Sequence, residues 1–142
     1  RAFILTIRAC GRRTLLCLWK PVMTMREVLS SLCMTLPTKS VVIISSKKGT
    51  VRANHYHLTD WHYCYVAEGE IDYYHRPHGS ENEPEMVTVK KGELFFTPPM
   101  IDHAMVFTED TVFYTFGRNP RDKESYEADV RRITLVDPST IG

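Results

Sequence analysis

Residues 49–69 read GTVRANHYHLTDWHYCYVAEG, and this stretch decides the fold class. Two histidines, His55 and His57, lie two positions apart on a segment that is predicted to be a strand. Side chains two apart on a strand point to the same face of a sheet. The turn at 58–60 then returns the chain antiparallel, so we expect His62 to face the first two histidines.

A fourth histidine, His103, follows the Pro98-Pro99 turn on a distant strand and can complete the set. Neutral imidazole is the commonest metal ligand in proteins, and it suits zinc, iron, copper and nickel. A lone histidine is more often a core or surface residue, but four at matching spacing predict a metal centre. We therefore predict one divalent metal ion (Zn, Fe, Mn or Ni) bound by His55, His57, His62 and His103.

Short β-rich runs, broken by turn residues, surround this stretch. The expected strands lie at 41–44, 51–57, 61–67, 71–75, 86–89, 94–97, 103–107 and 111–116. Strands of this length and spacing, with little helix between them, indicate a sandwich or a closed barrel.

The chain of 142 residues is sized for one domain, and its composition changes toward both ends. Residues 1–38 form a basic N-terminal segment that we expect to pack on the barrel, although an Arg-rich, acid-poor start is also typical of an organellar targeting peptide. Residues 39–118 form the barrel. Residues 119–142 form a tail with one short helix over 121–130, and 131–136 could add a last strand.

Composition excludes several function classes. The formal net charge is +1, so no overall field attracts nucleic acid or an anionic membrane. No apolar run approaches the roughly 20 residues that cross a bilayer. The four cysteines show no CxxC pair and no disulfide framework, which favours a cytoplasmic setting. The expected partner is a small-molecule ligand or substrate.

The first group of residues resembles the first motif of the small cupins. That motif is Gly, five residues, His-x-His, three or four residues, Glu, six residues and Gly. The chain matches every spacing from Gly49 to Gly69, with His62 where the family usually has Glu.

The second cupin motif, Gly, five residues, Pro-x-Gly, two residues, His, three residues and Asn, is matched in part. Gly92, Pro98 and His103 are in register, while Met100 replaces Gly and Phe107 replaces Asn. The resemblance covers about residues 39–117. It implies an all-β fold, a cupin-type double-stranded β-helix (jelly-roll) barrel with a short C-terminal helix.

The resemblance implies a function only by class. The segment RANHYH at 52–57, followed by an aromatic strand, is similar to small cupins of sugar pathways, which implies a sugar or sugar-nucleotide isomerase or epimerase. An iron-dependent dioxygenase is one alternative. A non-catalytic, metal-stabilised ligand-binding or sensor module is another. Small cupins often pair through sheet edges, so a homodimer is expected.

The presence of His62 at the position where the cupin motif usually has Glu changes the charge of the predicted metal centre. Four neutral imidazoles leave the whole +2 charge on the metal, which favours an anionic substrate. Four histidines in a tetrahedron would close a zinc site, whereas an octahedral field leaves two open positions. His62 could also turn away and leave three ligands.

Alternation along the strands predicts how the neighbours of the histidines point. Arg52 is three positions from His55 and so belongs to the opposite face, and only a bulge would bring it inward. We therefore predict that Arg52 is a surface residue. Asp60 either orients a ligating imidazole or only makes the turn.

Other side chains near the predicted metal centre are expected to be structural. Cys64 should point inward as a small buried residue. Met105 and Phe107 should form an apolar floor. Four aromatic residues are candidates for a cavity wall, although core packing is the favoured role for most of them: Tyr73, Tyr74, Phe96 and Tyr114. His75 and His78 are predicted to lie on the surface.

Overall fold

The computed structural model describes residues 37–141, so nearly all of the predicted N-terminal segment 1–38 lies outside the described residues. Within them the chain forms two antiparallel sheets and one short α-helix. The first sheet has the order β1-β8-β3-β6 and the second β5-β4-β7-β2-β9. The strands are β1 (Ser40–Ser46), β2 (Val51–His57), β3 (His62–Glu68), β4 (Glu70–Pro77), β5 (Glu85–Lys90), β6 (Leu94–Thr97), β7 (Ile101–Phe107), β8 (Thr111–Gly117) and β9 (Val130–Arg132).

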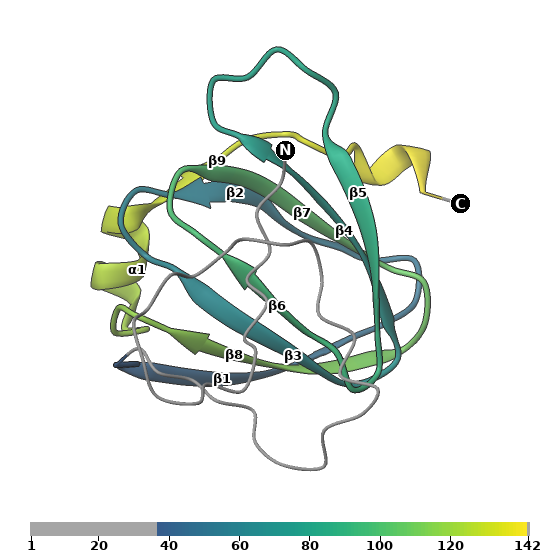
Figure 1. Cartoon of the computed structure of the whole chain (residues 1–142), viewed down its shortest axis with the longest axis horizontal. Helices are drawn as coiled ribbons and strands as arrows, with labels where there is room; N and C mark the ends of the chain where they lie inside the picture. Colours follow the sequence, from purple (N-terminus) through teal and green to yellow (C-terminus); the bar gives the residue numbers. More distant parts are fainter. Residues whose placement is uncertain (1–36, 142) are drawn as a thin grey trace, which may run out of the picture.

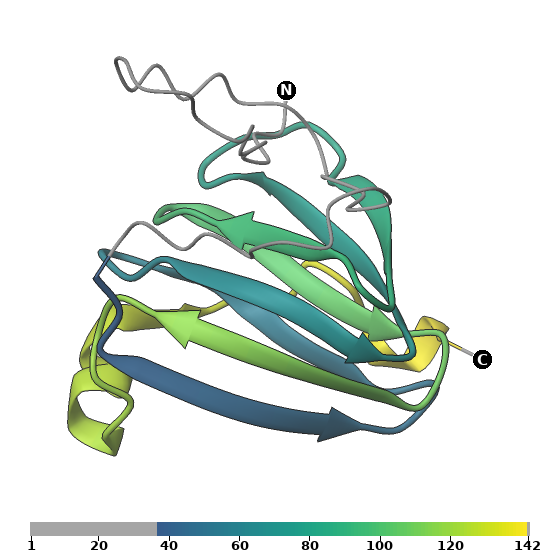
Figure 2. The same ribbon diagram turned by 60° about the horizontal axis from the view of Figure 1, so that its bottom comes forward.

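The two sheets face each other and enclose the core, as Figures 1 and 2 show. Strands such as β4 and β8 alternate buried and half-buried residues, because every second side chain points to the inner face. The inner side chains form one apolar cluster: Cys64, Val66, Ile71, Tyr73, Val89, Phe95, Met105, Phe107 and Phe113. Each of the eight predicted strands overlaps an observed one, which confirms the all-β jelly-roll prediction.

The chain crosses between the sheets where a simple hairpin was expected. β2 pairs with β7 and β9, whereas β3 pairs with β6 and β8. The turn at 58–60 therefore carries the chain from one sheet to the other. His62 faces His55 and His57 across the barrel and not from a neighbouring strand.

The C-terminal helix α1 (Lys123–Asp129) closes one end of the barrel (Figure 1). Asp122 caps its first turn by accepting a hydrogen bond from the Ser125 amide at 2.9 Å. The helix ends at Val130, where the backbone becomes extended and β9 pairs along the edge of β2. A 3-10 turn, η1 (Pro138–Thr140), follows.

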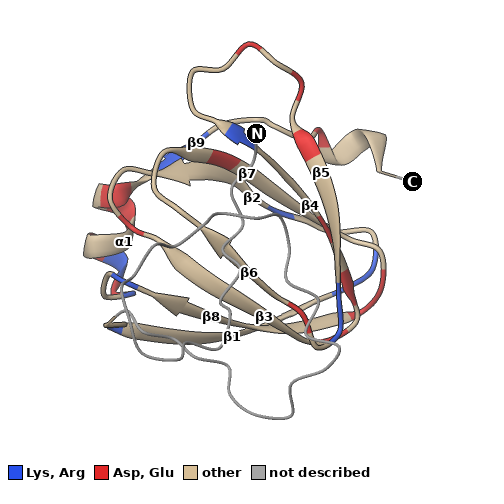
Figure 3. Ribbon diagram, viewed as in Figure 1, with Lys and Arg blue, Asp and Glu red and all other residues tan. Residues whose placement is uncertain are grey.

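Charged side chains of both signs are mixed over the strand ends, loops and α1 (Figure 3). No helix within the described residues is long and apolar enough to cross a membrane.

The structure shows how Met100 and Phe107, the two departures from the second cupin motif, are accommodated. Met100 takes the place of the motif glycine with φ at 58°, a left-handed conformation that favours glycine. Its backbone is held there by hydrogen bonds with the carbonyl of His57 and the amide of His78. Phe107, which replaces the motif asparagine, is fully buried and stacks on Phe113 in the core.

Gly69 ends the first motif at a place where only glycine fits. Its φ is +82°, and a Cβ there would lie 2.4 Å from the Asp110 carbonyl oxygen and 2.8 Å from the Thr111 Cα. We expect Gly69→Ala to lower the free energy of unfolding by about 2 kcal/mol or more, from backbone strain and steric overlap together. Gly79→Ala is the matched control, because its φ is +80° but nothing lies within 4 Å of the added Cβ. Equal losses in urea unfolding of the two variants would contradict the steric part of this prediction.

Candidate metal centre

The rings of the four predicted histidines meet inside one end of the barrel. His55 and His57 come from β2, His103 from the neighbouring β7, and His62 from β3 in the opposite sheet. The ring centroids are 4.6 Å apart for His55–His103, 4.8 Å for His55–His57 and 4.8 Å for His57–His62. One ring nitrogen each from His55, His57 and His103 lies within 4.8 Å of the other two. His62 adjoins this three-histidine group but is not part of it.

Two of these rings are fixed in the tautomer that leaves Nε2 free. His57 Nδ1 donates to the Asp129 carboxylate at 3.0 Å, and His103 Nδ1 donates to the Ile101 carbonyl at 2.9 Å. The Nε2 atoms of both rings are buried and accept no hydrogen bond from the described part of the chain. Each Nε2 therefore presents a lone pair, which is the state that a metal ligand requires.

Asp129 is one of the residues of this site that sequence reasoning missed. It is the last residue of α1, and the pairing of Val130 with His57 places it beside the His57 ring. Besides His57, its carboxylate accepts hydrogen bonds from the Thr59 amide at 2.8 Å, the Thr59 hydroxyl at 2.7 Å and the Asp60 amide at 3.1 Å. Burial disfavours its charge, but these hydrogen bonds outweigh burial and hold the pKa of Asp129 below its usual value.

Asp60 makes the turn, which is one of the two roles predicted for it. One carboxylate oxygen accepts a hydrogen bond from the Asn119 amide at 2.9 Å, which fixes the turn. The other lies 3.6 Å from His62 Nδ1, beyond hydrogen-bond distance, and this buried nitrogen has no hydrogen-bond partner within the described residues. Orientation of the His62 ring by Asp60 therefore stays a prediction. Ligation by His62 stays a prediction.

A bulge in β2 puts Arg52 on the same face of the sheet as His55, which corrects its predicted orientation, whereas its predicted exposure is confirmed. The register with β7 pairs Arg52 with Met105, Ala53 with Ala104 and His55 with His103, so Asn54 is an extra residue. Because one residue is added, Arg52 and His55 share a face although they are three apart. Arg52 lines the cavity beside His55 while staying exposed at its mouth.

A cavity of about 350 Å³ opens onto three of the histidines, His55, His62 and His103. Arg121 and Tyr126 also line this cavity, and they belong to the segment that closes the barrel end. The Arg121 guanidinium lies 4.8 Å from the centroid of the Tyr126 ring. The described lining includes two arginines and no carboxylate, so the cavity suits an anion. Its lining residues are Val42, Ile44, Arg52, Ala53, His55, His62, His103, Met105, Phe113, Thr115, Arg121 and Tyr126.

Solved structures match this fold, whereas no family model and no curated protein matches the sequence. The sugar 3,4-ketoisomerase QdtA from Thermoanaerobacterium thermosaccharolyticum, in complex with TDP, is 18% identical with a TM-score of 0.60, and the match covers 71% of each chain. The dTDP-4-dehydrorhamnose 3,5-epimerase from Sulfolobus tokodaii is 18% identical with a TM-score of 0.59, over 71% of this chain and 62% of the epimerase. The capsular polysaccharide assembling protein CapF from Staphylococcus aureus is 22% identical with a TM-score of 0.60, over 70% of this chain but only 29% of CapF. These neighbours are cupin-type jelly rolls.

The chain has a cupin fold. The fold that the two cupin motifs predicted is thereby confirmed.

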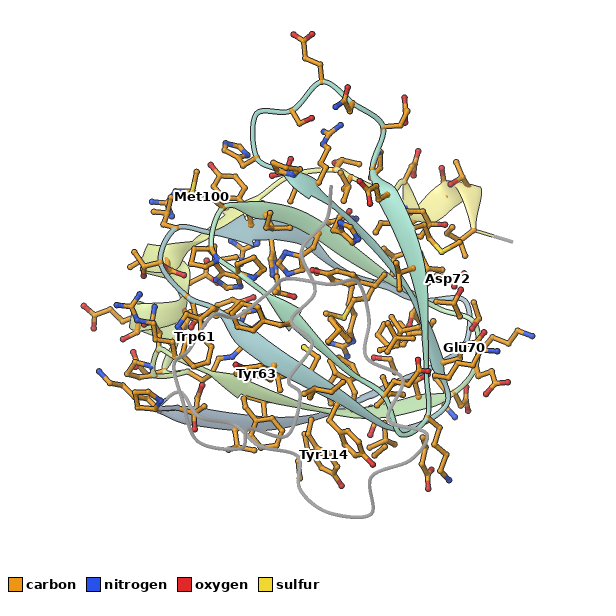
Figure 4. All side chains as sticks on the ribbon, viewed as in Figure 1. Trp61, Tyr63, Glu70, Asp72, Met100 and Tyr114 are labelled. Carbon is orange, nitrogen blue, oxygen red and sulfur yellow. The ribbon has the colours of Figure 1, made fainter. Side chains whose placement is uncertain are left out.

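Two of the four aromatic candidates, Tyr73 and Phe96, are buried in the core of the cupin barrel, which is the packing role favoured for most of them. None of the four predicted wall residues lines the cavity: the Tyr73 hydroxyl is buried against Thr97 at 2.9 Å, and Tyr114 lies on the outer side of its sheet (Figure 4). His75 is 4% exposed, so its predicted surface position is wrong. It faces inward because it pairs with His103 across β4 and β7. His78 is exposed as predicted, and its ring stacks on Tyr56.

The interior of the cupin barrel contains the predicted apolar residues. Met105 lines the cavity, and Phe107 packs in the core behind it. Cys64 is fully buried, and burial raises the pKa of its thiol to about 12. It is therefore a small core residue and not a reactive thiol.

The three converging histidines, His55, His57 and His103, are neutral at ordinary pH. Burial, together with the neighbouring histidines, lowers the pKa of His55 to about 3. Burial and His62 lower the pKa of His57 to about 4, although the bond to Asp129 opposes them. Burial also holds the pKa of His103 well below its usual value. Neutral rings can bind a metal cation without first losing a proton.

The metal-free protein should therefore lose stability as the pH falls from about 6.5 to about 4. Below 6.5 the unfolded chain protonates its histidines, while folded His55 and His57 resist protonation until about pH 3 to 4. The unfolded state binds more protons in this window, so stability is complete above 6.5 and declines below it. Melting temperatures between pH 7.5 and 4.5, with chelator present, measure the effect. His55→Gln should fall less steeply, and a wild-type melting temperature that is constant from pH 7.5 to 5 would contradict the prediction.

Proposed function

We propose that this cupin barrel is an enzyme that binds one divalent metal ion on its histidines and isomerises or epimerises a small sugar-like carbonyl compound. The observation that carries the proposal is the convergence of ring nitrogens from His55, His57 and His103, with the Nε2 atoms of His57 and His103 buried and unpartnered within the described residues. Of these three, His55 and His103 line the cavity. We propose His55, His57, His62 and His103 as the ligands of this ion.

The donor set fits a metal. A buried polar atom without a partner costs about 1–3 kcal/mol, and a bound cation would satisfy the Nε2 atoms of His57 and His103 together. Neutral imidazole nitrogens suit zinc, iron and nickel better than magnesium or calcium. A metal bound there would supply Lewis-acid polarisation of a substrate carbonyl.

Residues of the chain would bind the substrate, exclude water and move the proton. Arg52 and Arg121 would bind an anionic group of the substrate, because guanidinium groups form paired hydrogen bonds with carboxylates and phosphates. Apolar lining residues, among them Ile44 and Phe113, would exclude water. The proton next to the carbonyl would be moved by Tyr126, which lines the cavity beside the three-histidine group.

The substrate class is supported by the names of the structural neighbours, which include a 3,4-ketoisomerase, a 3,5-epimerase and a 3'-monoepimerase. One QdtA structure contains TDP-4-keto-6-deoxyglucose. Sugar-nucleotide carbonyl compounds are therefore the first substrates to test.

The test is solvent exchange at the carbon next to the carbonyl. Metal-loaded protein in D₂O should place deuterium on TDP-4-keto-6-deoxyglucose or on a smaller keto sugar, as followed by NMR, and His103→Ala should not. Oxygen uptake with candidate substrates would favour the iron-dependent dioxygenase. Ligand binding without turnover or oxygen uptake would favour the sensor module. No exchange with any of these sugars would contradict the isomerase proposal.

We also propose that the barrel forms a homodimer in a cytoplasmic setting. Val41 and Ile43 on the edge strand β1 are 60% and 66% exposed, and Ile43 pairs with Tyr114 on the outer face of the same sheet. An exposed apolar edge of this kind is suited to pairing. Sedimentation should give a dimer for the wild type and a monomer for Ile43→Lys, and a monomeric wild type would contradict the proposal.

A further inference from the structure

The bulge in β2 is tied to the C-terminal part of the chain through Asn54. The segment that follows β9, residues Ile133–Val136, is called here the C-terminal strap. Asn54 Oδ1 accepts hydrogen bonds from the amides of Leu135 and Val136, both at 3.0 Å, and Asn54 Nδ2 donates to the Val136 carbonyl at 2.8 Å. The Asn54 carbonyl also accepts from the Ile133 amide at 2.9 Å. The strap therefore holds both the side chain and the backbone of Asn54.

The backbone of the bulge needs such a restraint. Ala53 and Asn54 have φ values of 66° and 51°, in the left-handed region that non-glycine residues rarely adopt. Asparagine tolerates this conformation, whereas alanine is strained in it and stays there only when its surroundings impose it. The side-chain amide of asparagine has an oxygen that can accept two hydrogen bonds and a nitrogen that can donate. The strap offers two amide donors and one carbonyl acceptor to this side chain.

The bulge determines where Arg52 points. On a regular strand, Arg52 and His55 would project from opposite faces, because they are three residues apart. The extra residue puts Arg52 opposite Met105 and His55 opposite His103, on one face of the sheet. Arg52 Nε then donates to the Ser46 hydroxyl at 2.7 Å, and the guanidinium lines the cavity.

We propose that Asn54 is a positioning residue: with the C-terminal strap it holds the bulge that places Arg52 beside His55, and so it sets the affinity of the cavity for anions. This inference rests on the proposed function in that Arg52 binds an anionic group. Asn54 itself is not among the residues that line the cavity. It acts through Arg52.

The experiment measures binding of inorganic phosphate, the probe anion, to the full chain by calorimetry. Arg52→Gln should weaken phosphate binding at least about tenfold, because it removes a charged hydrogen-bond donor. Asn54→Gly keeps a backbone that accepts positive φ but loses the side-chain bonds to the strap, and it should weaken binding about as much. The double variant should bind no more weakly than Arg52→Gln alone, since both changes remove the same interaction.

Thr88→Val is the control for a merely structural loss. It removes the 2.7 Å hydrogen bond that Thr88, on the far edge strand β5 of the same sheet, donates to Asp72 on β4, and it should leave phosphate affinity unchanged. Should Asn54→Gly fail to fold, Asn54→Asp, which keeps an acceptor for the strap amides, is the second variant and should lose less affinity than Arg52→Gln. Wild-type affinity in a folded Asn54→Gly protein would overturn the proposal.

A crystal structure of Asn54→Gly separates this inference from the proposed function. A wild-type protein that does not bind phosphate would refute anion binding by Arg52, and the structure would still test positioning. Arg52 turned out of the cavity, with the bulge lost, would support the role of Asn54. An unchanged bulge with Arg52 still lining the cavity would overturn it.

Discussion

Asp129→Ala should reduce the stability of the protein and its metal affinity together. The substitution removes the acceptor for the Thr59 amide, the Asp60 amide and His57 Nδ1, all of which would be left without their partner. An unpartnered buried donor costs about 1–3 kcal/mol, so the free energy of unfolding should fall by about 3 kcal/mol or more. His57 would also lose the bond that fixes its tautomer, and removing such a partner lowers metal affinity by roughly 10- to 100-fold.

Urea unfolding at pH 7 and calorimetric titration with Zn²⁺ measure the two effects of Asp129→Ala. Asp129→Asn should lie between the wild type and alanine, because an amide oxygen can still accept some of these hydrogen bonds. Glu127→Ala is the matched control on the same helix. Glu127 pairs with the exposed Arg132 at 2.7 Å, and an ion pair on the surface contributes little to stability. Similar losses for Asp129→Ala and Glu127→Ala would contradict the account.

His103→Ala should abolish the response of the protein to a chelator. In the wild type, metal that binds only the folded barrel raises its stability by mass action, by about 4 kcal/mol at a free metal concentration 1,000 times the Kd. A chelator should therefore lower the wild-type melting temperature. The variant, which lacks one of the three converging ring nitrogens, should melt at a low temperature with or without chelator.

The control for this experiment is His78→Ala, which removes a histidine that is exposed and lies outside the cavity. It should keep the chelator response of the wild type. A His103→Ala protein that is still stabilised by added metal to the same extent as the wild type would show that the ring is not a ligand.

The strands and the convergence of the histidines followed from the sequence because both depend on local alternation. Side chains at His55 and His57 point the same way on any strand, and the spacing of two cupin motifs ties His103 to them. The assignment of β2 and β3 to different sheets did not follow, since a three-residue turn can close a hairpin or cross between sheets.

The remaining parts of the site depend on contacts distant in sequence. The bulge at Asn54 carries no glycine to indicate it, and its restraint comes from Val136, 82 residues away. Asp129, Arg121 and Tyr126 reach the site because β9 pairs with β2 and brings α1 to the barrel end. In the sequence these three belong to a charged tail that is typical of any surface helix.

The most direct test of the account is the metal stoichiometry of the purified, folded protein. Metal-free wild type titrated with Zn²⁺, Fe²⁺, Mn²⁺ or Ni²⁺, with elemental analysis after removal of free ion, should bind one ion per chain. His103→Ala should bind none, and His62→Ala should show whether the fourth ring contributes. A folded wild-type protein that binds none of these ions would contradict the metal centre and leave a cavity lined by histidines and arginines.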